Sequence, residues 1–154
     1  MGEEILSSDF ATADFEIFRQ ALLAETAQLQ QRFAGQGFAV SHPVAGFELE
    51  AWLVDRELRP APLNQEFLSR FNNPLASPEL ASFNIEVNTE PRSLSGHVFS
   101  AMHQSLDETW RAIRSTAQTI DADVIMCGIL PTVCDTDLTL ANMSGMQRYR
   151  ALNR

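Results

Sequence analysis

Polar and apolar residues alternate along two short stretches of the chain, GFELEAWLVD (residues 46–55) and FNIEVNTEP (residues 83–91). Side chains two positions apart on an extended chain point to the same face. The first stretch therefore has one apolar face and a second face that presents Glu48 and Glu50, and the second stretch presents Glu86 opposite its own apolar face. The alternation predicts two strands that each place one face on a core.

Apolar residues spaced three and four positions apart predict two long helices, one from Phe15 to Phe33 and one from Phe99 to Ile120. Glycines at positions 35 and 37 are expected to end the first helix. A short helix is predicted for residues 64–71, and the start of another near the C-terminus. The apolar run at residues 123–130 predicts a central strand, and the proline-containing segments 56–65 and 72–80 predict loops.

The order helix, strand, loop, strand, long helix, strand is typical of an α+β fold. We expect a small, mainly antiparallel sheet with the long helices packed on one face. A chain of 154 residues is long enough to bury one core, so a single domain over residues 1–154 is predicted. In such a sheet the faces that present Glu48, Glu50 and Glu86 would lie side by side.

The charge and composition exclude several kinds of binding partner and catalytic site. A net charge of −9 argues against binding to nucleic acid or to an anionic membrane. All 11 basic residues are arginine, which excludes a phosphate-binding loop lysine or a Schiff-base lysine within these residues. The two cysteines and three histidines lack the spacing of a zinc site. The acidic start of the chain and the absence of a long apolar run predict a cytoplasmic protein.

Glu48, Glu50 and Glu86, with Glu90 nearby, would converge on one surface if the two strands are neighbours. Clustered carboxylates are typical ligands of hard cations, and Mg²⁺ is commonly held by a few carboxylates together with substrate phosphates. Phosphoryl transfer is the chemistry that most needs such a site, because it depends on positioning and charge neutralisation. The spacing alone favours a polar sheet face that lies in water over a metal site.

Four segments in order add a resemblance: GFELEAWLVD, SPELASFNIEVNTEPRSLSG (residues 77–96), GILPT (residues 128–132) and MQRYRALN (residues 146–153). Together they resemble the glutamate–cysteine ligase-type carboxylate–amine ligases, relatives of glutamine synthetase that include an enzyme of glutathione biosynthesis. The resemblance implies a curved antiparallel sheet. It also implies that ATP activates a carboxylate to an acyl phosphate, which an amine attacks to give an amide.

The resemblance also implies roles for the acidic residues. Glu48 and Glu50 match the first acidic strand of the family and would bind Mg²⁺ or Mn²⁺. Glu86 matches the second acidic strand and would complete the metal site. Glu79, in the preceding loop, is a weaker candidate and is expected to be a helix-cap or surface residue.

Five further positions match segments of the family that contact substrate. Asn88, Thr89 and Arg92 would line the amino-acid pocket. Arg148 and Tyr149 match an Arg-Tyr pair and would act in catalysis, since an arginine can hold a carboxylate or phosphate through two hydrogen bonds.

Members of this family are several hundred residues long, so the chain is interpreted as the N-terminal portion of a larger catalytic domain. We expect the isolated chain to be inactive and to self-associate through uncovered sheet edges. Its partners would be ATP and a small amino-acid substrate, with glutamate joined to an amine such as cysteine. The alternative is a non-catalytic module that keeps the sheet and binds a small molecule or a partner chain.

Overall fold

The computed structural model describes residues 4–35, 37–38 and 42–153. Contacts along the chain separate it into two compact units. Residues 44–145 form the first, called here the sheet unit, and residues 1–43 with 146–154 form the second, called here the terminal unit. Both alternating stretches and the amphipathic segment 99–120 fall within the sheet unit.

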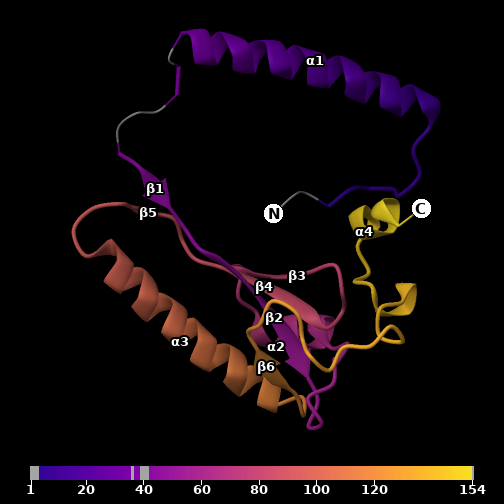
Figure 1. Ribbon diagram of the computed structural model, residues 1–154, viewed down its shortest axis with the longest axis vertical. Helices are drawn as coiled ribbons and strands as arrows, with labels where there is room; N and C mark the ends of the chain where they lie inside the picture. Colours follow the sequence, from indigo (N-terminus) through magenta and orange to yellow (C-terminus); the bar gives the residue numbers. More distant parts are fainter. Residues whose placement is uncertain (1–3, 36, 39–41, 154) are drawn as a thin grey trace. The chain divides into compact units, whose positions relative to one another are not determined.

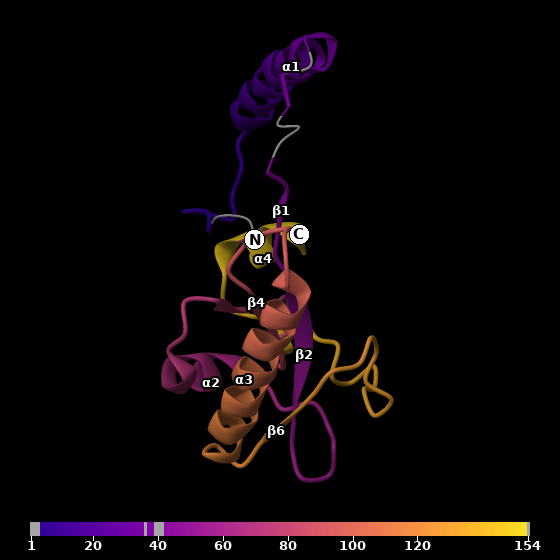
Figure 2. The same ribbon diagram turned by 90° about the vertical axis from the view of Figure 1, so that its left-hand side faces the viewer.

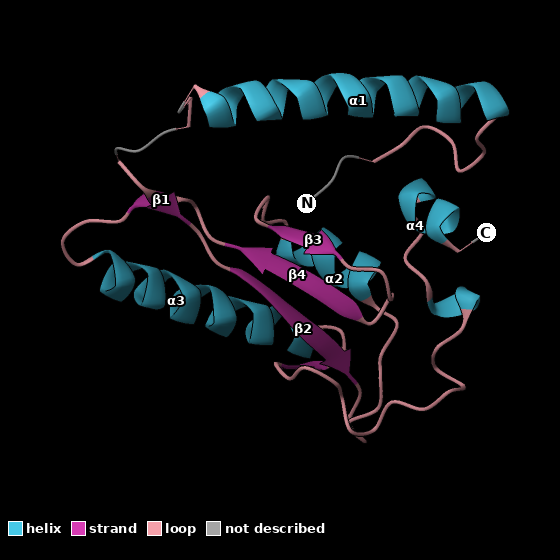
Figure 3. Cartoon of the chain, turned by 45° about the horizontal axis from the view of Figure 1, so that its top comes forward, coloured by secondary structure: helices cyan, strands magenta, loops and turns pink. Residues whose placement is uncertain are grey.

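The sheet unit is built on four antiparallel strands. In spatial order they are β3 (Ala76–Pro78), β4 (Asn84–Asn88), β2 (Glu48–Val54) and β6 (Asp123–Ile125). Figure 3 shows β3, β4 and β2 side by side. The two short strands β1 (Val44–Ala45) and β5 (Arg92–Ser93) form a separate antiparallel pair. Both strands predicted from alternation are confirmed, and they are direct neighbours.

The register of β2 against β4 separates an apolar face from a polar one. Ala51 lies opposite Ile85 and points toward the core, whereas Glu50 lies opposite Glu86 on the other face. A shift of one residue would exchange the two faces, so burial of the apolar set fixes the register. The alternation in the sequence therefore determines which glutamates meet.

Two helices, α2 (Asn64–Phe71) and α3 (Val98–Gln118), cover the apolar face of the sheet (Figures 1 and 2). The buried core cluster joins both helices to the strands and contains Ala51, Leu53, Ala61, Phe67, Ile85, Val87, Ile113, Ala117, Ala122 and Val124. The apolar stripe of α3 thus packs as the spacing predicts. The α+β class, with an antiparallel sheet and a long helix on its apolar face, is confirmed.

The terminal unit contains α1 (Thr12–Ala34) and α4 (Gln147–Leu152). At the start of α1 the carboxylate of Asp14 accepts a hydrogen bond from the backbone N–H of Ala11 at 2.7 Å. At its end the N–H of Gly35 donates to the carbonyl of Gln31 at 2.9 Å, as expected for a terminating glycine. The helix has no buried residue, so the expectation that its regularly spaced apolar side chains pack into a core is wrong.

Two expectations about the sheet are wrong. The segment 123–130 was expected to form a central strand, but β6 ends at Ile125 and lies at an edge of the described sheet. Past that point Met126 and Ile129 are exposed, by 49% and 77%, and of the remaining apolar residues of the run Leu130 is buried. The loop predicted at residues 72–80 contains β3, because its backbone pairs with β4 despite the nearby prolines. None of the described helices is long and apolar enough to cross a membrane.

Candidate functional site

The polar face of the sheet brings the predicted glutamates together. Glu50 on β2 lies directly opposite Glu86 on β4, and Glu48 lies opposite Asn88 two residues further along, on the same face. Directly opposed side chains have Cβ atoms about 5 Å apart, which is close enough for their carboxylates to interact. Glu48 and Glu86 share a hydrogen bond between their side chains. We call Glu48, Glu50, Glu86 and Glu79 the acidic cluster.

Glu79 is a member of this cluster that the sequence interpretation assigned to a cap or the surface. It precedes β4 in the chain, and its side chain hydrogen-bonds to Glu86 and lies within electrostatic reach of Glu50. The turn between β3 and β4 folds this residue back over the polar face. No periodic pattern marks it, because it lies between strands, so only the pairing of β3 with β4 reveals its place.

Glu86 is the buried centre of the cluster, with 3% of its surface exposed. Its Oε1 accepts a hydrogen bond from the Nδ2 of Asn88 at 2.7 Å and a second from the hydroxyl of Ser77 at 3.3 Å. Ser77 lies opposite Glu86 on β3, so three neighbouring strands contribute to the surroundings of this one carboxylate. Burial of a carboxylate is costly unless such donors replace its water.

The pKa values within the acidic cluster are shifted in different directions. The hydrogen bond to Glu86 raises the pKa of Glu48, and desolvation by its neighbours and the charges of Glu86 and Glu50 raise it further. Burial is the main cause of a raised pKa at Glu79. Burial also acts to raise the pKa of Glu86, but the hydrogen bonds with Asn88, Glu48 and Glu79 outweigh it and the pKa of Glu86 lies below its ordinary value. Glu86 therefore stays ionised while Glu48 and Glu79 hold protons more readily.

This arrangement is one that a cation would stabilise. The oxygen atoms that the cluster offers to a metal are carboxylate oxygens, which suit Mg²⁺ and Mn²⁺ rather than a metal that prefers sulfur or imidazole. Among the described residues, no group of three or more Asp, Glu, His or Cys side chains already has coordination geometry. Glu48 and Glu79, whose pKa values are raised, instead hydrogen-bond to Glu86 and can hold protons there. A divalent cation that displaces these protons would remove the same charge repulsion.

Thr89 and Arg92 lie beyond the end of β4. The hydroxyl of Thr89 accepts a hydrogen bond from the backbone N–H of Phe47 at 2.7 Å, and the backbone N–H of Thr89 donates to the carbonyl of Phe47 at 2.9 Å. Thr89 thus joins the β2 and β4 segments just outside the paired strands. Arg92 is an exposed residue of β5, opposite Ala45.

Arg148 and Tyr149 both lie on α4, in the terminal unit. The guanidinium of Arg148 donates to the hydroxyl of Tyr149 at 2.8 Å, and its Cζ lies 4.6 Å from the centroid of the Tyr149 ring. The two residues therefore form a cation–π pair with an additional hydrogen bond. The helix start predicted near the C-terminus is confirmed.

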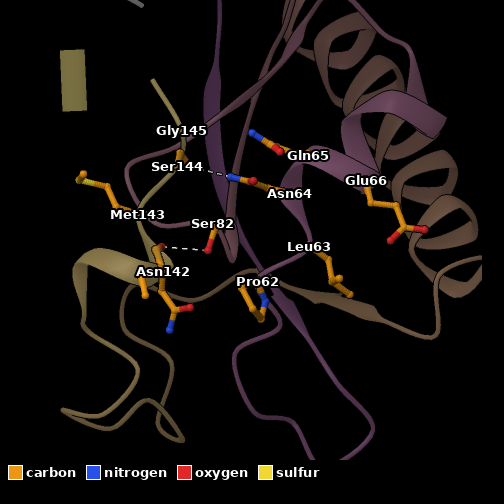
Figure 4. Close-up of a pocket in the computed structure, with 11 residues that line it drawn as sticks. Pro62, Leu63, Asn64, Gln65, Glu66, Ser82, Asn142, Met143, Ser144 and Gly145 are labelled. Carbon is orange, nitrogen blue, oxygen red and sulfur yellow. Dashed lines mark hydrogen bonds between the residues drawn. The ribbon is translucent and has the colours of Figure 1, made fainter. Parts of the chain in front are cut away.

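A polar cavity of about 540 Å³ lies at the start of α2 and contains none of the predicted site residues (Figure 4). The buried Asn64 amide donates to the hydroxyl of Ser144 at 2.8 Å and to the carbonyls of Ala81 and Asn84 at 3.3 and 3.2 Å. The hydroxyl of Ser144 donates in turn to the carbonyl of Glu79. This network fixes the loop that contains Glu79.

A smaller hollow of about 200 Å³ adjoins the acidic cluster and is lined by Glu50, Trp52, Glu79, Leu80, Ala81, Asn84 and Gly128. The indole of Trp52 is held in place by a hydrogen bond from its Nε1 to the carbonyl of Cys127 at 3.1 Å. It also stacks on Phe83 with ring centroids 5.4 Å apart. These two contacts explain why β2 has an aromatic residue on the same face as its glutamates.

Comparisons with models of known protein families, with curated protein sequences and with solved structures found no match to this chain.

Proposed function

We propose that the chain is the N-terminal part of an ATP- and Mg²⁺-dependent carboxylate–amine ligase of the glutamate–cysteine ligase type. The observation that supports this most directly is the register that places Glu50 opposite Glu86, with Glu48 and Glu79 hydrogen-bonded to the same buried carboxylate. Four carboxylates gathered over one sheet face are costly without a cation. The type of reaction is proposed from the four sequence segments that resemble this family.

In this proposal Glu48, Glu50 and Glu86 hold the Mg²⁺, and Glu79 is a fourth oxygen donor. Bound Mg²⁺ neutralises the phosphates of ATP while a carboxylate is activated and then attacked by an amine. The part of the protein in this step is to hold carboxylate oxygens at fixed positions on neighbouring strands. A rigid sheet positions such ligands better than loops do.

The remaining roles follow the resemblance. Thr89 and Arg92 contact the amino-acid substrate, and Arg148 with Tyr149 acts on the reacting carboxylate or phosphate. Arginine suits this task because its planar guanidinium offers two parallel donors to a carboxylate or phosphate. Its contact with Tyr149 keeps the Arg148 guanidinium oriented within α4.

A second candidate function is a binding module without catalysis. The polar cavity at the start of α2 favours it, because amide and hydroxyl groups line a space large enough for a small molecule. The two candidates differ in the ligand that stabilises the fold. Only the ligase proposal requires stabilisation by Mg²⁺ with ATP through the acidic cluster.

Thermal unfolding with and without millimolar Mg²⁺ and ATP tests the proposal. A ligand that binds only the folded state raises the midpoint, by an amount equivalent to about 2.7 kcal/mol when its concentration is 100 times the Kd. We expect a rise in the wild-type protein, loss of the rise in Glu48→Gln, and a normal rise in Glu57→Gln, an exposed glutamate outside the cluster. An equal rise in both variants would contradict the metal assignment.

A further inference from the structure

Glu86 receives two uncharged hydrogen-bond donors on the same oxygen atom. The Nδ2 of Asn88 lies 2.7 Å from Oε1, and the hydroxyl of Ser77 lies 3.3 Å from it. Asn88 is two residues along β4 and therefore on the same face, whereas Ser77 reaches across from its paired position on β3. Two strands thus converge on one carboxylate oxygen.

These two donors restrict rotation of the Glu86 carboxylate about its last side-chain torsion. The last torsion of a glutamate joins an sp³ to an sp² carbon and has only a broad preference. Two donors from rigid strands define the plane of the carboxylate. Because Glu86 is almost fully buried, bulk water cannot take over this role.

We propose that Asn88 and Ser77 are positioning residues that hold the carboxylate of Glu86 in one orientation within the acidic cluster. The consequence for catalysis rests on the function proposed above, since a metal ligand held in one orientation loses less freedom when the metal binds. The inference revises the role of Asn88, because its amide nitrogen is engaged by Glu86 instead of facing a substrate. Ser77 is a new residue of the site.

The first test uses the metal-free protein and side-chain amide signals in ¹H–¹⁵N NMR spectra. A hydrogen bond to the Glu86 carboxylate should move the Asn88 amide protons downfield and slow their exchange with water. In Glu86→Ala both effects should disappear. Asn84 is the internal control, because it lies on the same face of β4 and its Nδ2 donates at 3.5 Å to the carbonyl of Ala51.

The second test measures Mg²⁺ affinity by titration calorimetry in folded variants. Removing a group that orients a metal ligand typically weakens binding by about 10–100-fold. We expect a loss of that size in Asn88→Ala and a smaller loss in Ser77→Ala. Ser77→Thr retains the hydroxyl and should restore wild-type affinity, which a purely structural role for Ser77 would not predict. Asn84→Ala should leave the affinity unchanged.

The outcomes separate this inference from the proposed function. If the Asn88 signals depend on Glu86 but the wild-type protein binds no Mg²⁺, the positioning contacts stand and the ligase proposal fails. If the Asn88 signals are the same with and without the Glu86 carboxylate, the positioning inference is wrong. Wild-type Mg²⁺ affinity in both Asn88→Ala and Ser77→Ala would overturn it as well.

Discussion

The two faces of the four-stranded sheet have opposite effects on the stability of the fold. On the apolar face Leu53 and Ile85 have no exposed surface and pack beneath α2 and α3. On the polar face Glu50 and Glu86 lie directly opposite each other, an arrangement in which like charges repel. The first face stabilises the fold by burying apolar area, whereas the second reduces its stability.

A protein that needed only a soluble sheet could place lysine or threonine opposite these glutamates. The chain instead surrounds Glu86 with donors and partners from both neighbouring strands and from the loop that contains Glu79. Repulsion retained at such a cost is typical of functional sites, where pKa values are perturbed. The apolar face therefore accounts for stability, the polar face is where we propose the function, and substitutions on each should behave differently.

The largest effect is expected on the apolar side. Phe67 of α2 has no exposed surface, so Phe67→Ala should lower the free energy of unfolding by about 3–5 kcal/mol. Urea unfolding followed by circular dichroism measures this loss. Phe99→Ala is the matched control, because Phe99 is 66% exposed and its removal should change stability by only about 0.5 kcal/mol. Equal losses would show that the helices do not cover the core as described.

The second effect concerns the network that fixes the loop containing Glu79. In Asn64→Asp an oxygen replaces the amide nitrogen that faces the oxygens of Ala81, Asn84 and Ser144. We expect a loss of about 1–3 kcal/mol, because these buried acceptors lose their donor. Gln65→Glu adds the same charge at the next, exposed position and should cost far less. Urea unfolding of both variants makes the comparison.

Much of the sheet unit could be predicted because its signals are local. The strand alternation and the spacing of apolar residues in α3 directly reflect which side chains are buried. The same reasoning placed Glu48, Glu50 and Glu86 on polar faces, and the antiparallel pairing of β2 with β4 then brought them together. Local pattern was sufficient wherever burial decided the structure.

Features that depend on pairing between distant segments could not be predicted. β3 is short, follows Pro74 and ends at Pro78, so it has no alternation of its own and exists only through its pairing with β4. Its pairing brings Ser77 against Glu86, and the turn that follows brings Glu79 there too. The run that begins at Asp123 resembled a central strand, but only its first three residues pair with β2.

On the polar face, unlike the apolar face, replacing a charged side chain should raise the stability of the fold. In the absence of metal, Glu48→Gln removes a carboxylate whose pKa is raised by Glu86, so the midpoint of thermal unfolding at neutral pH should rise slightly. The contribution of a group with a raised pKa is fully present below its unfolded pKa and is lost as pH rises through the folded pKa. The advantage of the variant should therefore be absent in acid and appear at higher pH. Glu57→Gln should show no such trend.

The smallest effect is expected at an ion pair outside the acidic cluster and has the reverse pH dependence. Arg114 of α3 donates to both oxygens of Asp123 at 3.2 and 3.1 Å, and this pair lowers the pKa of Asp123. A carboxyl with a lowered pKa stabilises the fold above its unfolded pKa, and the contribution is lost as pH falls through the folded pKa.

Arg114→Gln should therefore lower the unfolding midpoint slightly at neutral pH and leave it unchanged in strong acid. Because both side chains are about half exposed, solvent screening keeps the effect small and high salt should reduce it. A double-mutant cycle with Asp123→Asn isolates the pair from other effects of each substitution. If the coupling stayed constant from acid to neutral pH, the pair would act through packing instead of charge. The pH dependence of unfolding would then no longer distinguish Glu48, a carboxylate close to other carboxylates, from Asp123, a carboxylate paired with an arginine.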